Sequence, residues 1–360
     1  MKVNTNQFIS MLAKAIKGVG KNKLIPLTSM LDIRCENNYL QLGATDGSNY
    51  FYVYGECEDA DDFSEVVVSA DKLATLIART TSEYVTLVVN DNVLEVRGNG
   101  KYLIELPIDE NGYSIKFPIH TFKNAIEAGT ISIDDIKTVA SSLSSALATT
   151  LENPCYCNYY FGDNVFSTDR LKIAAFAKSV FGSAEVLLSP EVISFLTLNN
   201  SDFSYTIYSD NVITFQSDTM LVYSRLAEGI DDYAVEAITT LVNEEFPYSC
   251  QIKKDELLNA LNRLSLFVDA YEQNALELSF YNDKLNISSK KKSGYEEVRY
   301  DDNFYVSNIE FNCTIDITLF INQLKSYAND IVTIEFGKDM SIKLVDDKNG
   351  ITQIISLLNN

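Results

Sequence analysis

Two short segments carry side chains that could do chemistry: Thr45-Asp46-Gly47 and Thr168-Asp169-Arg170. Each ends one apolar, strand-like run and begins another. A carboxylate beside a hydroxyl and a glycine could suggest the corner of an aspartic protease. That motif places the aspartate before the threonine and the glycine, whereas the order here is reversed and the second copy lacks the glycine. We therefore predict a structural corner that the chain builds twice.

The six cysteines and the single histidine offer few other reactive groups. Cys155 and Cys157 could form half of a metal site, but no second cysteine pair is near them in the sequence, and alternation predicts two strand residues on one face. His120 has no marked partners for a Ser/His/Asp triad. No P-loop or dinucleotide-binding glycine pattern occurs. The sequence therefore predicts no catalytic residue, no metal, no cofactor and no enzymatic activity.

Length and composition set the class of protein. At 360 residues and 46% apolar composition, the chain suits two or three packed domains. No stretch has the roughly 18 uncharged apolar residues of a membrane helix, and the N-terminal segment lacks the apolar region of a signal peptide. We therefore expect a cytoplasmic protein with no membrane partner. Its net charge of −21 disfavours a protein that simply coats nucleic acid, so local basic exceptions become informative.

A repeat of about 120 residues organises the chain. Each third begins with an amphipathic helix, has a second helix opened by Ser or Thr with an acid two residues later, and then has a hairpin of two alternating strands. The first helices are expected at 6–19, 133–148 and 254–268, the second helices at 69–80, 189–198 and 314–327, and the hairpins begin at Tyr84, Phe203 and Ile331.

The repeat predicts an α+β fold of three tandem domains, at residues 1–118, 119–244 and 245–360. Each domain is a duplicated βαβββ unit, in which two helices pack on antiparallel sheets. Proline-containing polar linkers are expected at 109–122 and 242–249. Residues 286–298 occupy the position of the Thr-Asp corner in the third domain, but they contain no Thr-Asp pair. The third copy of the corner has diverged.

The order of these features resembles the bacterial DNA polymerase processivity clamp, the beta subunit of DNA polymerase III. The local matches are Ile25-Pro26-Leu27, Ala44-Thr45-Asp46-Gly47, Ser167-Thr168-Asp169-Arg170-Leu171 and Glu228-Gly229-Ile230-Asp231-Asp232-Tyr233. The resemblance implies a head-to-tail homodimer whose six domains form a ring around duplex DNA without reading its sequence. It also implies a pocket that binds short peptide motifs of the polymerase and the clamp loader.

The basic residues on the predicted helices are the candidate DNA contacts. Residues 1–31 carry five lysines and no acid, and Lys14, Lys17 and Lys21 cluster opposite the apolar side of the first helix. The alternative is a solvated basic face. The helices of the second domain depart from the expectation, because they are acidic and rich in Ser and Thr. The candidates are Lys14, Lys17, Lys21, Lys23, Lys72, Arg79, Lys253, Lys254, Arg263 and Lys325. Lys290, Lys291 and Lys292 are expected in a solvated turn.

In the family, the partner pocket lies between the second and third domains, and the resemblance transfers it position by position. The candidates are Thr168, Leu171, Ile173, Ile230, Tyr233, Ile354, Ile355, Leu357 and Leu358. For the last four, the alternative is an ordinary final strand in its own core. Several family residues are replaced here, so we expect altered peptide specificity and a polymerase or loader unlike the usual bacterial set, as in a phage or mobile element.

The dimer contact implied by the resemblance joins the first domain of one chain to the third domain of the other. The candidates are the edge segment 101–106, with Leu103, and the stretch Leu266, Phe267 and Val268. The alternative function is a clamp-shaped decoy, which would sequester replication partners without encircling DNA.

Overall fold

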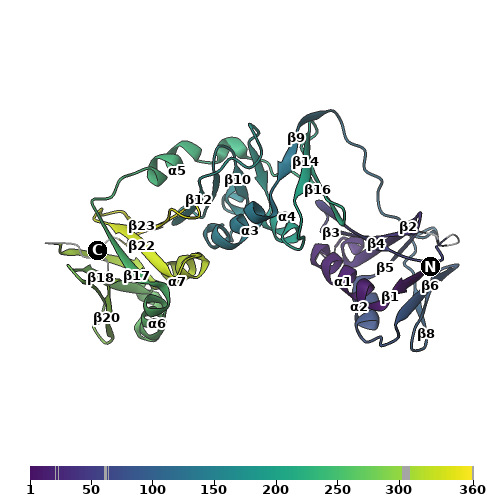
Figure 1. Ribbon diagram of the computed structural model, residues 1–360, viewed down its shortest axis with the longest axis horizontal. Helices are drawn as coiled ribbons and strands as arrows, with labels where there is room; N and C mark the ends of the chain where they lie inside the picture. Colours follow the sequence, from purple (N-terminus) through teal and green to yellow (C-terminus); the bar gives the residue numbers. More distant parts are fainter. Residues whose placement is uncertain (21, 23, 61–62, 64, 302–308, 359–360) are drawn as a thin grey trace. The chain divides into compact units, whose positions relative to one another are not determined.

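The structure is a computed structural model that describes residues 1–20, 22, 24–60, 63, 65–301 and 309–358. Its described residues form two compact units (Figure 1). Unit 1 contains residues 1–136 and 191–226, and unit 2 contains residues 137–190 and 227–360. Each unit has one eight-stranded and one four-stranded sheet, and all their strand pairs are antiparallel. The α+β class is confirmed, and the division into three domains stays a prediction.

Unit 1 builds its eight-stranded sheet from strands of the first and second thirds of the chain, in the order β5-β2-β3-β4-β16-β15-β14-β9. These strands are β2 (Met30–Glu36), β3 (Tyr39–Thr45), β4 (Asn49–Glu56), β5 (Val66–Ser69), β9 (Ala125–Ile131), β14 (Phe203–Tyr208), β15 (Val212–Gln216) and β16 (Met220–Arg225). The four-stranded sheet has the order β1-β6-β7-β8, from β1 (Lys2–Asn4), β6 (Tyr84–Asn90), β7 (Val93–Arg97) and β8 (Lys101–Glu105).

Unit 2 repeats this plan with strands of the second and third thirds, in the order β13-β10-β11-β12-β24-β23-β22-β17. These strands are β10 (Tyr159–Phe161), β11 (Val165–Thr168), β12 (Lys172–Phe176), β13 (Val186–Leu188), β17 (Tyr248–Lys253), β22 (Ile331–Phe336), β23 (Ser341–Asp346) and β24 (Ile351–Ser356). The four-stranded sheet has the order β20-β19-β18-β21, from β18 (Ala275–Phe280), β19 (Lys284–Ser289), β20 (Tyr295–Arg299) and β21 (Phe311–Asp316). All three predicted hairpins are confirmed, as β6-β7, β14-β15 and β22-β23.

The helices occupy the predicted positions but are shorter. They are α1 (Thr5–Ala15), α2 (Ala70–Ala78), α3 (Ile133–Ser142), α4 (Pro190–Leu196), α5 (Val235–Val242), α6 (Lys254–Leu264) and α7 (Ile317–Ser326). The first helix of each third ends in a 3₁₀ turn, which accounts for its longer predicted span. One predicted start is wrong: Thr314 lies in β21, and the N-cap of α7 is Asp316, whose carboxylate accepts hydrogen bonds from the N–H groups of Thr318 and Leu319.

Helix α5 was not predicted. Its N-cap residue, Ala234, forms no side-chain capping bond, so the usual sequence signal for a helix start is missing. None of the helices in the described residues has the length and apolar character needed to span a bilayer.

The two eight-stranded sheets are joined in the same way. In unit 1, β4 pairs with β16, and in unit 2, β12 pairs with β24. Each of these is the last strand of a three-stranded meander, in which neighbouring strands follow one another in sequence. Two further meanders end in β8 and β20, and both strands lie at the edge of their four-stranded sheets. Within the described residues, β8 and β20 are thus the meander ends that pair with no second meander.

Candidate nucleic-acid interface and partner site

The two Thr-Asp corners have the same hydrogen bonds. The Thr45 hydroxyl donates to the Asn49 carbonyl at 2.7 Å and accepts from the Gly47 N–H at 3.0 Å. Asp46 accepts from the next two amides of the turn, those of Ser48 and Asn49. All of these carboxylate and hydroxyl contacts hold the turn together, so the corner is structural.

The second corner repeats each contact in unit 2. The Thr168 hydroxyl donates to the Lys172 carbonyl at 2.6 Å and accepts from the Arg170 N–H at 2.9 Å, while Asp169 accepts from the amides of Leu171 and Lys172. Gly47 has φ +104° and Arg170 has φ +76°, so the backbone is left-handed at the same position. Glycine is therefore dispensable at this corner, but its replacement costs some backbone strain.

The second corner adjoins an apolar cluster of unit 2. Ile173 pairs with Ile354 across β12 and β24, and Tyr233 packs into the same cluster with Ile230 at its partly buried margin. The Tyr233 ring lies 5.2 Å from the ring of Tyr160. Its buried hydroxyl has no hydrogen-bond partner within the described part of the chain. Four candidates from three separated segments of the sequence thus meet beside the corner.

The other candidates lie around this cluster or away from it. Leu171 is 56% exposed at the corner, and its carbonyl accepts from the Ser356 N–H. Ile355 is fully buried in a different cluster, against which Leu357 also packs. The Leu358 N–H donates to the Thr314 carbonyl. Because successive residues of β24 face opposite sides of the sheet, only Ile354 of the tail reaches the Tyr233 cluster.

Sequence reasoning missed seven buried members of the cluster, among them Cys155 and Tyr156. The expectation of a strand at Cys155–Cys157 is wrong, because a 3₁₀ helix spans Pro154–Cys157 and begins with proline. The turn buries Cys155 and places the Tyr156 ring 5.0 Å from that of Tyr233. Pro154 was the available signal. In the described part of the chain, no group of three or more His, Cys, Asp or Glu residues could hold a metal ion.

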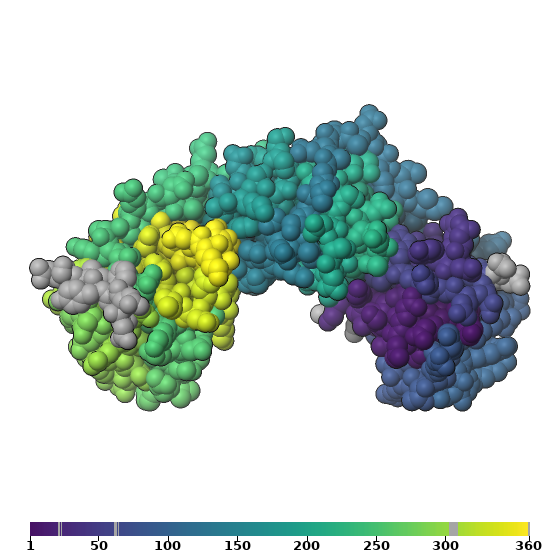
Figure 2. All heavy atoms as spheres, viewed as in Figure 1, coloured from purple at the N-terminus to yellow at the C-terminus, as the bar shows by residue number. Residues whose placement is uncertain are grey.

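The exposed side of α1 carries no acid. Asn6, Ser10, Ala13 and Lys17 follow one another on this side at helical spacing, and Lys14 lies beside them. Lys14 and Lys17 form no ion pair with any described residue. Figure 2 shows the N-terminal segment, coloured purple, on the visible surface of unit 1. This sparse positive charge on small polar residues suits attraction to phosphates without base recognition.

The other candidate basic residues differ in whether their side chains are already engaged by protein groups. Lys72 on α2, Arg79 at the C-cap of α2 and Lys325 on α7 are exposed, and no described acid pairs with them. Arg263 is engaged by Glu296 through two contacts, of 2.7 and 3.1 Å, and Lys253 lies 3.5 Å from Glu256. Lys254 donates to the Tyr327 carbonyl. Lys21 and Lys23 lie outside the described residues.

The predicted dimer residues are exposed apolar side chains. Leu103 on β8 is 64% exposed, and Leu266 is 81% exposed on the 3₁₀ turn after α6. Phe267 is half exposed and Val268 is partly buried. A Cβ atom at Gly294 would lie 3.2 Å from the Phe267 ring, so this turn packs against the residue that precedes β20.

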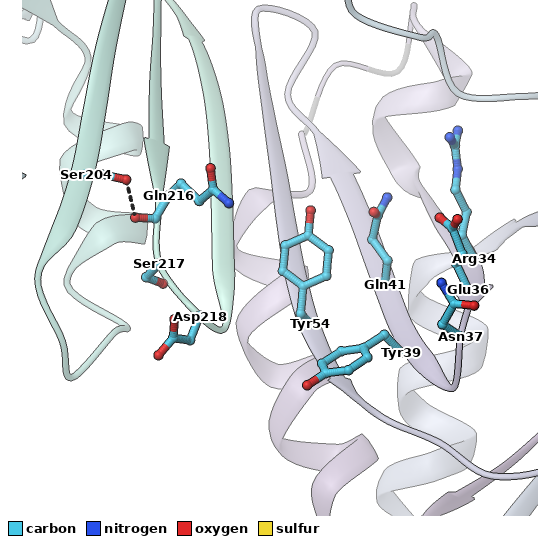
Figure 3. A pocket seen from close by; sticks show the side chains of 10 residues that line it. All are labelled: Arg34, Glu36, Asn37, Tyr39, Gln41, Tyr54, Ser204, Gln216, Ser217 and Asp218. Atoms are coloured by element: carbon cyan, nitrogen blue, oxygen red, sulfur yellow. Dashed lines mark hydrogen bonds between the residues drawn. The ribbon is translucent and has the colours of Figure 1, made fainter. Parts of the chain in front are cut away.

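A polar cavity of about 800 Å³ is lined by residues of the eight-stranded sheet in unit 1 and of its turns. Figure 3 shows its lining, which is Arg34, Glu36, Asn37, Tyr39, Gln41 and Tyr54 from one part of the sheet and Ser204, Gln216, Ser217 and Asp218 from the other. Behind Arg34, the Asp32 side chain is completely buried. The Arg34 Nε atom lies 2.7 Å from Asp32 Oδ2, but neither atom has hydrogen-bond geometry to a described residue.

Asp32 makes the stability of the protein dependent on pH. Burial raises the pKa of its carboxyl to about 7, against a partial opposing effect of Arg34. The folded state therefore binds the proton of Asp32 more tightly than the unfolded state does. Protonated Asp32 thus adds most to the free energy of unfolding below about pH 4, and this contribution is lost as the pH rises through about 7. We expect the free energy of unfolding, measured with denaturant, to fall by at most about 4 kcal/mol across this window. Asp32→Asn should flatten the profile, and an unchanged profile would contradict this assignment.

The comparisons with known proteins decide the family. A sequence model described as DNA polymerase III beta subunit, N-terminal domain, matches residues 1–124, and one described as the C-terminal domain matches residues 239–356. The chain belongs to the DNA polymerase III beta subunit family. The two matches together cover about two thirds of the chain.

Relatives in this family align along the whole chain. A beta sliding clamp of Staphylococcus epidermidis is 21% identical, and the alignment covers 98% of this chain and 97% of the relative. The sliding clamp of Bacillus subtilis has a TM-score of 0.82 at 17% identity, covering 100% of this chain and 98% of that one. The Pseudomonas aeruginosa clamp crystallised with griselimycin has a TM-score of 0.85 at 15% identity, covering 100% and 99%. The fold of a beta subunit is therefore kept over a widely diverged sequence.

Proposed function

We propose that this protein is a DNA sliding clamp, which encircles duplex DNA as a head-to-tail homodimer and holds a polymerase on its template. The observation that carries the proposal is the alignment of the whole chain with beta sliding clamps. We expect the protein to act in the cytoplasm as a processivity factor without catalytic activity of its own. The decoy alternative gains no support from these relatives, whose names describe sliding clamps.

The sheet topology supports a specific joint between the two chains. Inside each unit, two meanders join through their last strands, β4 with β16 and β12 with β24. The last strands of the remaining meanders are β8 and β20. Pairing β8 of one chain with β20 of the other would build two more eight-stranded sheets and remove both edges. Leu103 lies on β8, while Phe267 adjoins Gly294, the residue that precedes β20.

The helix surfaces suit a ring that slides. Attraction to phosphates must be weak and independent of sequence, since tight or specific contacts would stop movement along DNA. Lys14 on α1 and Lys72 on α2 provide such charge in unit 1, together with Lys17 and Arg79, which directly follow these helices. Arg263 contributes less, because its charge is already compensated by Glu296.

We predict that Lys14→Glu/Lys17→Glu weakens binding to duplex DNA. Two phosphate contacts become repulsions, so the affinity should fall by roughly tenfold or more and the slope of log affinity against log salt should decrease by about 2. Fluorescence anisotropy with a labelled duplex at several salt concentrations measures both.

The matched control is Lys290→Glu/Lys292→Glu, in the exposed turn between β19 and β20. This control changes the net charge by the same amount as Lys14→Glu/Lys17→Glu, but it does so in a turn that is predicted to be solvated. Equal losses in the two variants would show that only net charge matters, and would contradict the assignment to α1.

The second Thr-Asp corner is the site that we propose for polymerase and loader peptides. Leu171 provides an exposed apolar contact, and the buried Tyr233 ring supports the surface beside it. Ile173, Ile354 and Ile230 form the apolar wall beside it. Ile355 and Leu357 stabilise the adjoining core.

A further inference from the structure

The first Thr-Asp corner, in unit 1, opens on a cavity of its own. The cavity has a volume of about 410 Å³, and its lining includes residues of the paired strands β4 and β16. Gly47 and Ser48 of the corner line it, together with side chains from β16, from the β14-β15 turn and from the segment that precedes β9. Its size is within the range of ligand sites in proteins.

Internal symmetry relates this cavity to the second corner. Tyr50 lies five residues after Thr45, as Ile173 lies five residues after Thr168. Tyr50 pairs with Tyr223 across the β4-β16 joint, and Ile173 pairs with Ile354 across the β12-β24 joint. The same backbone framework therefore presents aromatic side chains in unit 1 where it presents aliphatic ones in unit 2.

A segment of the chain completes the aromatic wall. The His120 ring lies 4.1 Å from that of Tyr50, and the Phe122 ring lies 4.9 Å from that of Tyr223. His120 also packs 5.2 Å from Tyr223. The wall offers apolar surface for a side chain of a ligand, with polar groups set among the rings.

Two polar atoms of this wall lack partners. His120 Nε2 and Asp210 Oδ1 are buried, and neither forms a hydrogen bond with any described residue. Both residues line the cavity. Burial, aided by the charge of Arg34, lowers the pKa of His120, so the ring is neutral at pH 7 and retains a donor and an acceptor nitrogen. Neither unpaired atom is exposed to the cavity itself, so a ligand there contacts the ring faces and the exposed side chains.

The charge at the cavity is opposite to that of the chain. Lys123 and Arg225 line it and are exposed, and Asp210 is its single acid. A local excess of positive charge in a chain of net charge −21 favours an anionic group on the ligand. The aromatic wall and the two exposed cations together match a peptide that has a carboxylate next to an apolar side chain.

We propose that the cavity at the first Thr-Asp corner is a second peptide-docking site, which binds a short segment carrying an acidic residue beside an apolar one. The site is built from unit 1 alone and does not depend on DNA encirclement. A clamp with two different docking sites could hold two different partner peptides. One would contact the aliphatic side chain of Leu171, and the other, which is acidic, would bind beside Tyr50 and Tyr223.

The single histidine makes the test direct, because His120 is the only imidazole in the chain. The full-length protein is labelled with ¹³C at histidine Cε1 and titrated with the peptide acetyl-Ser-Asp-Leu-Phe-Gly-amide. We expect a saturable shift of the single His120 resonance. The peptide with Lys in place of Asp should bind about tenfold more weakly, because it loses its pairing with Lys123 and Arg225.

Variants assign the binding to this cavity. Arg225→Glu should lower the affinity for the acidic peptide by about tenfold. Lys123→Glu tests the same charge pairing on another segment of the wall. Lys116→Glu is the matched control, since Lys116 is exposed but does not line the cavity. Leu171→Asp, which alters the other corner, should leave this titration unchanged. The titration therefore tests the cavity in unit 1 even if the protein proves not to act as a sliding clamp.

Four results would overturn the proposal. They are the absence of a saturable shift, a shift unaffected by both Arg225→Glu and Lys123→Glu, a shift abolished by Leu171→Asp, and a saturable shift with single-stranded oligothymidine in place of the acidic peptide. The last result would assign the cavity to nucleic acid.

Discussion

Leu103→Asp is expected to turn the dimer into monomers at concentrations where the unaltered protein remains dimeric. The substitution puts a charge on an apolar side chain of β8 that is 64% exposed in the single chain. If β8 pairs with β20 of the partner, the aspartate is desolvated in the joint beside acidic neighbours such as Glu296 and Glu297. The dimer dissociation constant should rise by about 100-fold or more. Sedimentation equilibrium over a dilution series measures it.

Ile126→Asp is the matched control for this prediction. Ile126 is also an exposed apolar residue, at 67%, and it lies on β9, another edge strand of unit 1. The same change of chemistry should leave dimerisation intact, because β9 is not the end of a meander. Dissociation by both variants, or by neither, would contradict a joint that uses β8.

Leu171→Asp is expected to abolish binding of a partner peptide at the second corner. Leu171 is exposed beside the buried cluster of Ile173, Tyr233 and Ile354, and its side chain is free to contact a ligand. An aspartate there would oppose apolar contact while leaving the turn intact, because the hydrogen bonds of Leu171 use its backbone and not its side chain. We expect affinity for a standard clamp-binding peptide to fall by at least about 30-fold, measured by isothermal titration.

The control for the peptide-binding prediction is Leu151→Asp. Leu151 is 80% exposed, belongs to unit 2 and is not part of the Tyr233 cluster. The Leu151→Asp variant should bind the peptide with the same affinity as the unaltered protein. If Leu171→Asp binds equally well, the peptide docks elsewhere and the second corner is not the partner site.

The unaltered protein also tests the expected change in specificity. Ordinary low-micromolar affinity for the standard peptide would count against an altered partner pocket. Weak binding together with a normal fold would favour a polymerase or loader of a different kind.

Much of the fold was accessible from the sequence because local signals repeat. The apolar spacing of Phe8, Leu12, Ala15, Ile16 and Val19 predicts the buried side of the first helix. Phe8, Leu12 and Ala15 are buried, whereas Ile16 and Val19 lie beyond the end of α1 and are only partly buried. The three polar turns between alternating strands predict the hairpins. Joints between meanders were not predictable in this way, because the pairing of Tyr50 with Tyr223 joins residues that are far apart in the chain.

The candidate sites show where sequence reasoning reaches its limit. Thr168, Ile173 and Tyr233 could be named from the resemblance, but the alternation of β24 separates Ile354 from Ile355, and this separation depends on strand register. The charge of Arg263 suggested a DNA contact, whereas its pairing with Glu296 appears only when α6 lies beside β20. His120 looked unremarkable because its neighbours, Tyr50 and Tyr223, come from two distant strands.

The central claim is that two chains close into a ring. Small-angle X-ray scattering with absolute mass, recorded over a concentration series, tests it most directly. The account predicts a mass twice 40.3 kDa that persists on dilution, with a distribution of interatomic distances that requires a hollow centre. A mass of 40.3 kDa at every concentration, with a distribution that requires no central hole, would contradict it.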